Sequence, residues 1–204
     1  VLSEIENILQ HEIKNNDISV VGISVTYTPQ YTICEEIAAI IKRIDPRIVV
    51  IIGGQHVSFL DKNVLLWSKC IDAVSRGEGE WNMLDFVHSV LAKKDFSGIS
   101  GITFRNNGAI VRNPDRAFGD IAEIPRMNFG LIPKSFYHNR LMNIAACRGC
   151  MYACKFCAEQ IFWGNKVRRV PVKKLLVEAK ELFDKYKIGY LSFEDSMLPI
   201  ESDY

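Results

Sequence analysis

The sequence lacks any hydrophobic run long enough to cross a lipid bilayer. Its longest apolar stretches, such as residues 48–52, fall far short of the ~20 residues that a membrane-spanning helix requires. It also lacks a charge imbalance, because its formal net charge is only +1 over 204 residues. Such a balance gives no general electrostatic reason to bind nucleic acid or an anionic membrane. With no recognisable signal peptide, these absences predict a cytoplasmic protein with no membrane span and no nucleic-acid partner.

Cysteine is scarce but clustered, since four of the six cysteines lie within residues 147–157. A reducing cytoplasm and a metal site fit this cluster better than disulfides do. The run Cys150-Met-Tyr-Ala-Cys154-Lys-Phe-Cys157 brings three thiolates close enough to bind one metal centre. On a cubic 4Fe–4S cluster, three thiolates leave one iron without a protein ligand. An open iron is what a cluster needs in order to bind and reduce a substrate.

Zinc and a ferredoxin-type cluster are the alternatives for this run. Adding Cys147 gives two CxxC pairs, but structural zinc sites normally separate such pairs by a dozen or more residues. Here the gap between Cys150 and Cys154 is three residues. Ferredoxins usually carry C-x2-C-x2-C-x3-C-P, and no proline follows Cys157. The alternative function is therefore a non-catalytic Rossmann-like binding module with a four-cysteine zinc or iron–sulfur knuckle.

Strand and helix patterns alternate along the first half of the chain. Buried, β-branched runs predict strands, and apolar residues at helical spacing predict helices. The predicted strands cover residues 18–25, 47–52 and 71–75, and the predicted helices cover residues 2–14, 33–44 and 81–92. This alternation predicts a parallel α/β sheet with helices on both faces. The turn signal Asn106-Asn107-Gly108 predicts a β-hairpin after it.

Small and polar residues follow the carboxyl end of each predicted strand. Ligands of open α/β sheets bind beyond these ends, and glycine lets the backbone approach a ligand closely. The candidate ligand-facing residues are Ser24, Thr26, Gly53, Gly54, Gly77 and Glu78. His56 lies among them, and we interpret it as a loop histidine without a ligand role.

The second half of the chain has the pattern of one β/α unit. Residues 141–146 predict a strand that leads directly into the cysteine run, and residues 171–186 carry a regular helical stripe. Residues 190–193 predict a second strand, which is followed by Glu194 and Asp195. Strand, helix and strand in this order predict the start of a β/α barrel, with its chemistry at the carboxyl ends of the strands.

Together these motifs resemble the radical S-adenosylmethionine (radical SAM) enzymes, in particular the branch with a cobalamin-binding domain. The cysteine run, with Ala146-Cys147-Arg148-Gly149 before it, and the stretches VGIS, IIGGQH and RGEGE carry the resemblance. It implies a partial Rossmann-like domain (flavodoxin-like, of the cobalamin-binding type) over residues 1–118 and a linker over residues 119–140. The first units of a radical SAM β/α partial barrel follow over residues 141–204. By this count the chain is an internal fragment of a larger enzyme and inactive alone.

The resemblance also implies cofactors and a reaction. Cys150, Cys154 and Cys157 are the expected catalytic and metal-binding residues, holding a 4Fe–4S cluster that reductively cleaves S-adenosylmethionine to a 5′-deoxyadenosyl radical. The expected outcome is cobalamin-dependent methylation or a related C–H functionalisation of a small molecule, with flavodoxin or ferredoxin as electron donor. A radical SAM enzyme whose upstream domain has lost cobalamin is a further interpretation.

Further cofactor contacts follow from the same resemblance. Tyr152 and Phe156 are expected to pack against the adenine of S-adenosylmethionine. Glu194 and Asp195 are candidates for contacting S-adenosylmethionine or substrate, and a solvated charge or a helix partner is an equal interpretation for both. The strand-end residues of the first half are expected to lie along the nucleotide tail of cobalamin. Cys147 is interpreted as a bystander thiol.

Overall fold

The computed structural model describes residues 2–133 and 140–197. The chain forms two compact units, one of residues 1–118 and one of residues 119–204, and each is described by itself. Among the described helices, none combines the length and the apolar character needed to cross a membrane.

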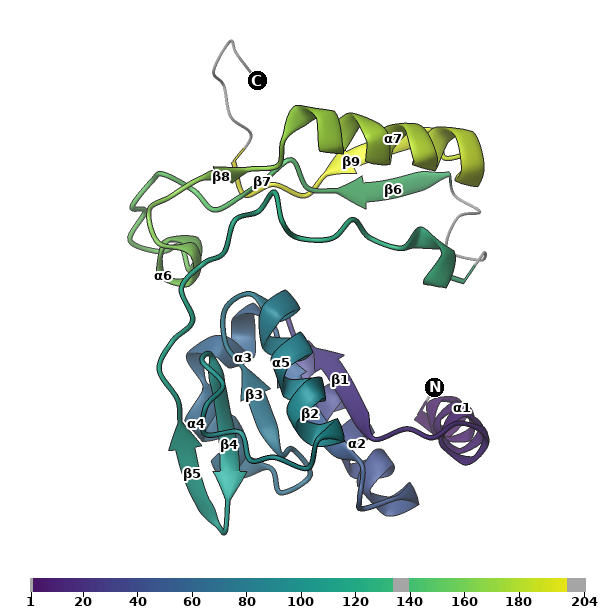
Figure 1. Ribbon diagram of the computed structural model, residues 1–204, viewed down its shortest axis with the longest axis vertical. Helices are drawn as coiled ribbons and strands as arrows, with labels where there is room; N and C mark the ends of the chain where they lie inside the picture. The colour runs from purple at the N-terminus through teal and green to yellow at the C-terminus, as the bar shows by residue number, and fades with distance from the viewer. Residues whose placement is uncertain (1, 134–139, 198–204) are drawn as a thin grey trace. The chain divides into compact units, whose positions relative to one another are not determined.

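A five-stranded sheet forms the centre of the first unit (Figure 1). The strands lie in the order β1-β2-β3-β4-β5. Strands β1, β2 and β3 run parallel, whereas β4 pairs antiparallel with both β3 and β5. The hairpin predicted around Gly108 therefore forms, and it extends the sheet as its last two strands. The strand bounds are β1 (Val20–Ser24), β2 (Val49–Gly53), β3 (Ala73–Ser75), β4 (Ile102–Asn106) and β5 (Ala109–Arg112).

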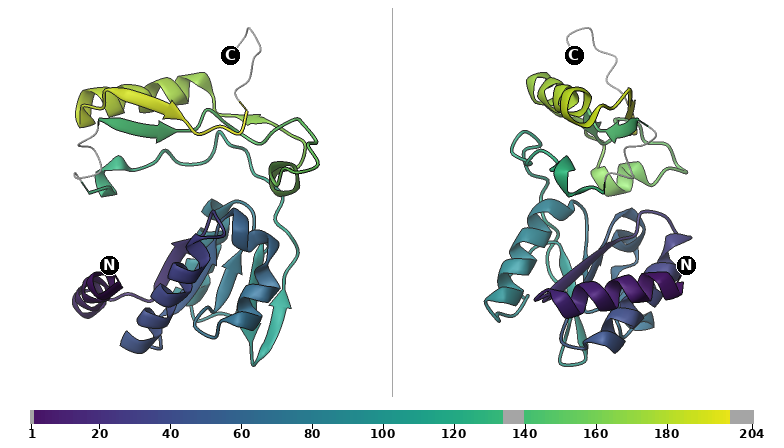
Figure 2. Two further views of the ribbon diagram at one scale, coloured as in Figure 1. Left: turned by 180° about the vertical axis from the view of Figure 1, so that it is seen from behind. Right: turned by 90° about the vertical axis from the view of Figure 1, so that its right-hand side faces the viewer.

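Helices cover both faces of this sheet, as the alternating pattern predicts. Figures 1 and 2 show α5 on one face and α2, α3 and α4 on the other, with α1 beside α2. The helix bounds are α1 (Leu2–Asn15), α2 (Gln30–Ile44), α3 (Gln55–Phe59), α4 (Asp61–Trp67) and α5 (Gly79–Leu91). The sequence analysis assigned no helix to residues 55–67. Val57, Val64 and Leu65 are all buried there, and their spacing was the signal for α3 and α4.

The central strand β2 shows why the strands read as continuous apolar runs. Val50 and Ile52 pack into the core beneath α2, α3 and α4. Ile51 lies between them in the sequence and packs into the opposite core, together with Phe86 of α5. Because successive side chains of a strand point to opposite faces, a strand that is covered on both faces needs an apolar residue at every position.

The second unit contains a parallel βαβ arrangement. Strand β6 (Leu141–Ile144) is followed by helix α7 (Val172–Tyr186) and strand β9 (Tyr190–Phe193), and β6 and β9 pair in parallel. The chain between β6 and α7 forms β7 (Cys147–Arg148), α6 (Glu159–Trp163) and β8 (Arg168–Arg169). This βαβ arrangement agrees with the expected start of a β/α barrel.

The segment predicted to be a linker, residues 119–140, is more closely packed than that description suggests. Residues 134–139 lie outside the described part of the chain. Before them, the short helix η1 (Phe129–Leu131) places Phe129 in one core with Ile144, Leu182 and Ile188. Phe129 is 2% exposed, so the apolar side chain anchors this segment to the β6–α7–β9 core.

A buried ionic network joins the hairpin to the rest of the first unit. Arg76 follows β3 and is only 5% exposed. Its guanidinium lies 3.4 Å from Asp61 Oδ2 and donates to the carbonyl oxygen of Asn113 at 2.7 Å. Arg112 Nε donates to the same Asp61 oxygen at 3.0 Å, and Thr103 Oγ1 also donates to it. Asp61 is therefore shared by two guanidinium groups, and Asp115 Oδ1 supplies a second carboxylate at 2.8 Å from Arg76 and 3.0 Å from Arg112.

We predict that Asp61→Asn lowers the free energy of unfolding by about 2 kcal/mol, because a charge-assisted hydrogen bond is lost and the buried Arg76 keeps only the exposed Asp115 as its countercharge. Urea denaturation of the purified chain measures this loss. The matched control is Glu6→Gln, which removes one partner of the exposed Arg43–Glu6 pair and should change stability very little. An equal effect of the two substitutions would contradict the structural role of the network.

The same carboxylate makes stability depend on pH. Burial raises the pKa of Asp61, but the hydrogen bonds from Thr103 and the Lys62 N–H, with the charges of Arg112 and Arg76, outweigh burial and leave the pKa below its ordinary value. A lowered folded-state pKa stabilises the protein above the ordinary carboxyl pKa, and this contribution is lost as the pH falls through the lowered value. Acid should therefore destabilise the native chain more steeply than Asp61→Asn.

Candidate functional site

The cysteine run lies on a loop that is closed at its base. Strand β7 pairs antiparallel with β8, and the Val170 N–H donates to the Ala146 carbonyl at 2.8 Å. Gly149 follows β7 with a φ of +96°, and a Cβ there would lie 2.1 Å from the Lys166 carbonyl oxygen. No residue other than glycine fits this position. The ladder and Gly149 thus hold together the two ends of a loop that begins at the carboxyl end of β6.

The three cysteines of the motif differ in exposure. Cys154 is exposed, whereas Cys150 and Cys157 are half-buried. The Cys157 N–H donates to the Cys154 carbonyl at 3.0 Å, which forms a tight turn between these two residues. Within residues 2–133 and 140–197, no three His, Cys, Asp or Glu side chains are gathered as metal ligands. The loop carries one exposed and two half-buried cysteines, a donor set whose number and type fit a cluster with three thiolate ligands, although the three side chains are not drawn together in this structure.

Cys147 occupies a different environment from the other three cysteines. It is 2% exposed, and its Sγ donates to the Met197 carbonyl at 2.9 Å. Burial, together with the neighbouring Asp195 carboxylate, raises the pKa of the Cys147 thiol to about 12. The sulfur is therefore a neutral hydrogen-bond donor that already has an acceptor. This environment supports the interpretation of Cys147 as a bystander and counts against a four-cysteine knuckle.

The parallel pairing of β6 and β9 brings Glu194 and Asp195 to the edge from which the cysteine loop leaves. The Glu194 N–H donates to the Ile144 carbonyl at 2.9 Å, and its side chain is exposed. The Asp195 carboxylate accepts from the Cys147 N–H at 2.6 Å and from the Ala146 N–H at 3.2 Å. Asp195 therefore fixes the start of the loop, a backbone role that the sequence analysis did not foresee.

Aromatic side chains of the loop fall into two groups. Phe156 is 93% exposed and Tyr152 is also exposed, so both are accessible to a ligand. Trp163, which was not among the predicted site residues, lies near two guanidinium groups. Arg148 lies 6.0 Å and Arg168 5.7 Å from its ring centre. These two arginines are paired across the β7–β8 ladder, and this pairing could not be seen without the fold.

The first unit has a cavity of about 410 Å³ at the carboxyl ends of β1, β2 and β3. Four of the six predicted ligand-facing residues of this unit line it, whereas Thr26 and Glu78 are not among its lining residues. No lining residue carries a charge. The lining consists of Gly22, Ile23, Ser24, Ile51, Ile52, Gly53, Gly54, Ser75, Gly77, Gly79 and Met83.

Two glycines of this cavity have left-handed backbone conformations for different reasons. Gly54 has a φ of +109°, and a Cβ there would lie 2.6 Å from the Val25 carbonyl oxygen, so the backbone is packed against the residue that follows β1. Gly77 has a φ of +71°, and a Cβ there would meet no described atom within 4 Å. Gly77 therefore faces open space at the wall of the cavity.

Polar side chains that the sequence analysis did not select hold these turns together. Ser58 Oγ donates to the Gly54 carbonyl at 2.8 Å and accepts from the Gly77 N–H at 3.1 Å. Asn82, which is fully buried, donates to Ser75 Oγ at 3.2 Å and to the Arg76 carbonyl at 2.8 Å. His56, which we interpreted as a loop histidine, lies in α3, and its Nδ1 is 3.2 Å from Oγ1 of Thr28 in the segment between β1 and α2.

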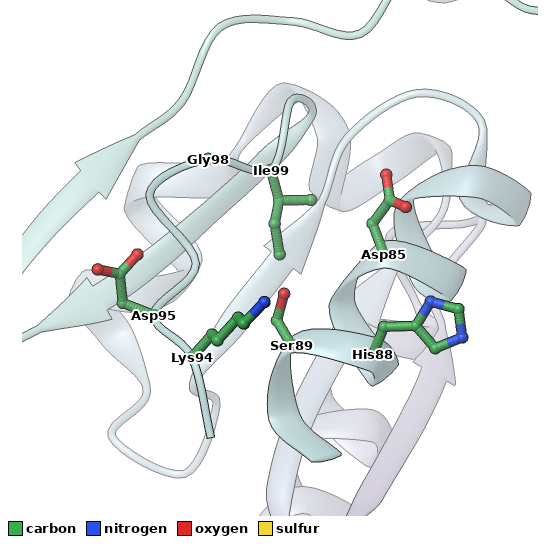
Figure 3. A pocket seen from close by; sticks show the side chains of 7 residues that line it. All are labelled: Asp85, His88, Ser89, Lys94, Asp95, Gly98 and Ile99. Atoms are coloured by element: carbon green, nitrogen blue, oxygen red, sulfur yellow. The ribbon is translucent and has the colours of Figure 1, made fainter. Parts of the chain in front are cut away.

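A larger cavity, of about 610 Å³, lies along the second half of α5 (Figure 3). Asp85, His88 and Ser89 of α5 line it together with Lys94, Asp95, Gly98 and Ile99. Asp85 pairs with Arg116, and Asp95 accepts a hydrogen bond from the Ser97 N–H. Neither the cysteines nor the strand-end residues line this cavity, so volume alone does not identify the candidate site.

Known protein families and curated proteins are similar to this chain over both of its units. Residues 2–86 match the B12 binding domain family. The uncharacterized methyltransferase PH0819 of Pyrococcus horikoshii is 30% identical over 187 residues, which cover 90% of this chain and 40% of that protein. The anaerobic magnesium-protoporphyrin IX monomethyl ester cyclase of Rubrivivax gelatinosus is 31% identical over 179 residues, covering 82% of this chain and 32% of the cyclase. The chain thus spans less than half the length of these enzymes.

Solved structures show the same fold. One is the radical S-adenosylmethionine methyltransferase TsrM from Kitasatospora setae, solved with cobalamin and a [4Fe-4S] cluster bound. Its TM-score is 0.78 at 19% identity, and the matched region covers 94% of this chain and 40% of the TsrM chain. Another is the cobalamin-dependent S-adenosylmethionine radical enzyme OxsB, solved with aqua-cobalamin and S-adenosylmethionine bound. Its TM-score is 0.76 at 18% identity, and the matched region covers 96% of this chain and 27% of the OxsB chain. The chain therefore contains a region of the B12 binding domain family, and it shares its fold with solved cobalamin-dependent radical SAM enzymes.

Proposed function

We propose that Cys150, Cys154 and Cys157 hold a 4Fe–4S cluster and that the chain is part of a radical SAM enzyme. The observation that carries this proposal is the division of the four clustered cysteines. Three cysteines, one exposed and two half-buried, lie on one closed loop, and the fourth is buried and hydrogen-bonded to Met197. Three thiolate ligands match a cluster that keeps one iron open for a ligand.

When bound, the cluster supplies the electron that cleaves S-adenosylmethionine to methionine and a 5′-deoxyadenosyl radical. The residues of this chain bind and orient the reacting groups. Tyr152 and Phe156 are exposed and are proposed to stack on the adenine, since a flat aromatic ring favours stacked contacts. Glu194 is proposed to contact S-adenosylmethionine or substrate. Asp195 positions the loop through the N–H groups of Ala146 and Cys147.

The cavity at the carboxyl ends of β1, β2 and β3 is the proposed site of cobalamin, with Ser24, Gly53, Gly54 and Gly77 as the contacting residues. Its lining is free of charged side chains, which suits an uncharged part of the ligand. Thr26 and Glu78 are proposed as neighbours of the cavity rim. Residues 1–118 are accordingly proposed as the cobalamin-binding domain and residues 141–204 as the start of the radical SAM barrel.

The proposed reaction of the whole enzyme is cobalamin-dependent methylation, or a related C–H functionalisation, of a small molecule. TsrM has been solved with its tryptophan substrate, and both curated relatives above are a methyltransferase or a cyclase by name. Reductive cleavage needs one electron at a time, so we propose a flavodoxin or a ferredoxin as electron donor. All six cysteines are free thiols, as expected in a reducing cytoplasm.

Anaerobic reconstitution with iron and sulfide tests the cluster. We expect the reduced chain to give a 4Fe–4S electron paramagnetic resonance signal that disappears in Cys150→Ala and remains in Cys147→Ala. In the full-length enzyme, the signal should shift on addition of S-adenosylmethionine, because the open iron gains ligands. Tight zinc binding that is lost in Cys147→Ala, with no cluster formed, would instead establish the four-cysteine knuckle.

The environment of Cys147 predicts a low reactivity toward alkylating agents. The thiolate is the nucleophile, and a pKa raised to about 12 keeps this thiol protonated at pH 8. Peptide mapping after iodoacetamide treatment of the metal-free native chain should find Cys154 labelled quickly and Cys147 unlabelled, with both labelled after denaturation. Rapid labelling of Cys147 in the native chain would show that it is available as a ligand.

Filling the proposed cobalamin cavity should prevent binding without harming the fold. Gly79 begins α5 and lines the cavity, and a Cβ there would meet no described atom within 4 Å. We predict that Gly79→Leu weakens hydroxocobalamin binding at least about tenfold, or about 1.4 kcal/mol, because the leucine side chain would occupy space in the cavity that the ligand needs. Gly98→Leu is the matched control, since Gly98 is equally open and lines the other cavity. Equal binding by both variants would exclude the cavity as the cobalamin site.

A further inference from the structure

We infer that Ser58 is a positioning residue, whose hydroxyl sets the separation of the two glycine turns that form the wall of the cavity. This inference rests on the proposed function of the cavity as the cobalamin site. Ser58 belongs to the short helix α3 (Gln55–Phe59). It is not among the residues that line the cavity, so it acts through Gly54 and Gly77.

The hydroxyl joins two turns at a point where the sheet no longer joins them. Strands β2 and β3 are paired as far as Gly53 and Ser75, which form the last pair of their ladder. Beyond this pair, Ser58 Oγ donates to the Gly54 carbonyl at 2.8 Å and accepts from the Gly77 N–H at 3.1 Å. A hydroxyl has one proton to donate and two lone pairs, so one side chain serves both turns.

The two turns differ in how firmly their surroundings fix them. Gly54 is in close contact with the backbone of Val25, since a Cβ there would lie 2.6 Å from its carbonyl oxygen. The site of a Cβ at Gly77 is open to 4 Å within the described residues, and a glycine without such contacts has access to a wide range of backbone conformations. The hydroxyl of Ser58 therefore anchors the open turn to the packed one.

A matched pair of substitutions isolates the hydroxyl. Ser58→Thr keeps it, whereas Ser58→Val replaces it with a methyl group in a side chain of the same branched shape. Both variants of the full chain are compared with the native chain in two measurements. Amide hydrogen exchange followed by NMR reports on the Gly77 N–H, and absorbance titration with hydroxocobalamin reports on binding. The thermal midpoint of each variant controls for loss of the fold.

We expect Ser58→Thr to behave like the native chain. In Ser58→Val, the Gly77 N–H loses its acceptor, so its exchange should accelerate about tenfold and hydroxocobalamin should bind about fivefold more weakly, the size of effect that one lost hydrogen bond produces. A merely structural role would lower the thermal midpoint of Ser58→Val without a selective change at Gly77. Native-like Gly77 exchange and hydroxocobalamin binding in Ser58→Thr, with both changed in Ser58→Val, would assign the effect to the hydroxyl.

Three results would overturn the inference, and they are distinguishable. Unchanged Gly77 exchange in Ser58→Val means that the hydroxyl does not hold the turn, whatever the cavity binds. Faster exchange with undiminished hydroxocobalamin binding means that the bridge exists but does not position the site. Failure of the native chain to bind hydroxocobalamin contradicts the proposed function of the cavity, and the positioning role of Ser58 for this ligand falls with it.

Discussion

Parallel pairing of strands is the constraint on which both candidate sites depend. In β1, β2 and β3 it places three carboxyl ends at one edge of a sheet, and the cavity lies at that edge. In β6 and β9 it places the start of the cysteine loop beside Glu194 and Asp195. Strands that run in the same direction must be joined by a crossover, so residues distant in the sequence end at the same edge.

Backbone groups, more than side chains, shape both sites. Gly54 is fixed by the Val25 carbonyl and Gly149 by the Lys166 carbonyl, and in both places an added Cβ would collide with a backbone oxygen. The polar side chains nearby mainly form hydrogen bonds with backbone groups. Ser58 bonds to both glycine turns, and Asp195 accepts from two N–H groups at the start of the cysteine loop. Sites built in this way leave their exposed side chains available for a ligand.

Much of this arrangement could be predicted from local patterns. Alternating apolar runs identified the strands and the long helices, and the glycines after β2 and β3 identified most of the predicted cavity contacts. What local patterns missed depends on pairing over long distances. Ser58 was not distinguishable from any other serine until β2 and β3 brought Gly54 and Gly77 within its reach. Asp195 was a candidate ligand contact by the family resemblance, and its backbone role was missed because its N–H partners lie nearly fifty residues earlier.

The four clustered cysteines show how the fold distinguishes side chains that spacing alone leaves equivalent. By spacing alone, Cys147 and Cys150 form a CxxC pair as good as that of Cys154 and Cys157. The structure separates them, because β7 carries Cys147 into the ladder with β8 and buries it, whereas Gly149 turns the chain out before Cys150. Ligation by Cys147 would require a buried, protonated thiol to give up both its proton and its hydrogen bond to Met197. Cys154 is exposed and Cys150 and Cys157 are half-buried, so these three thiols are the better candidates for the proposed cluster, in which three thiolate ligands would leave one iron open.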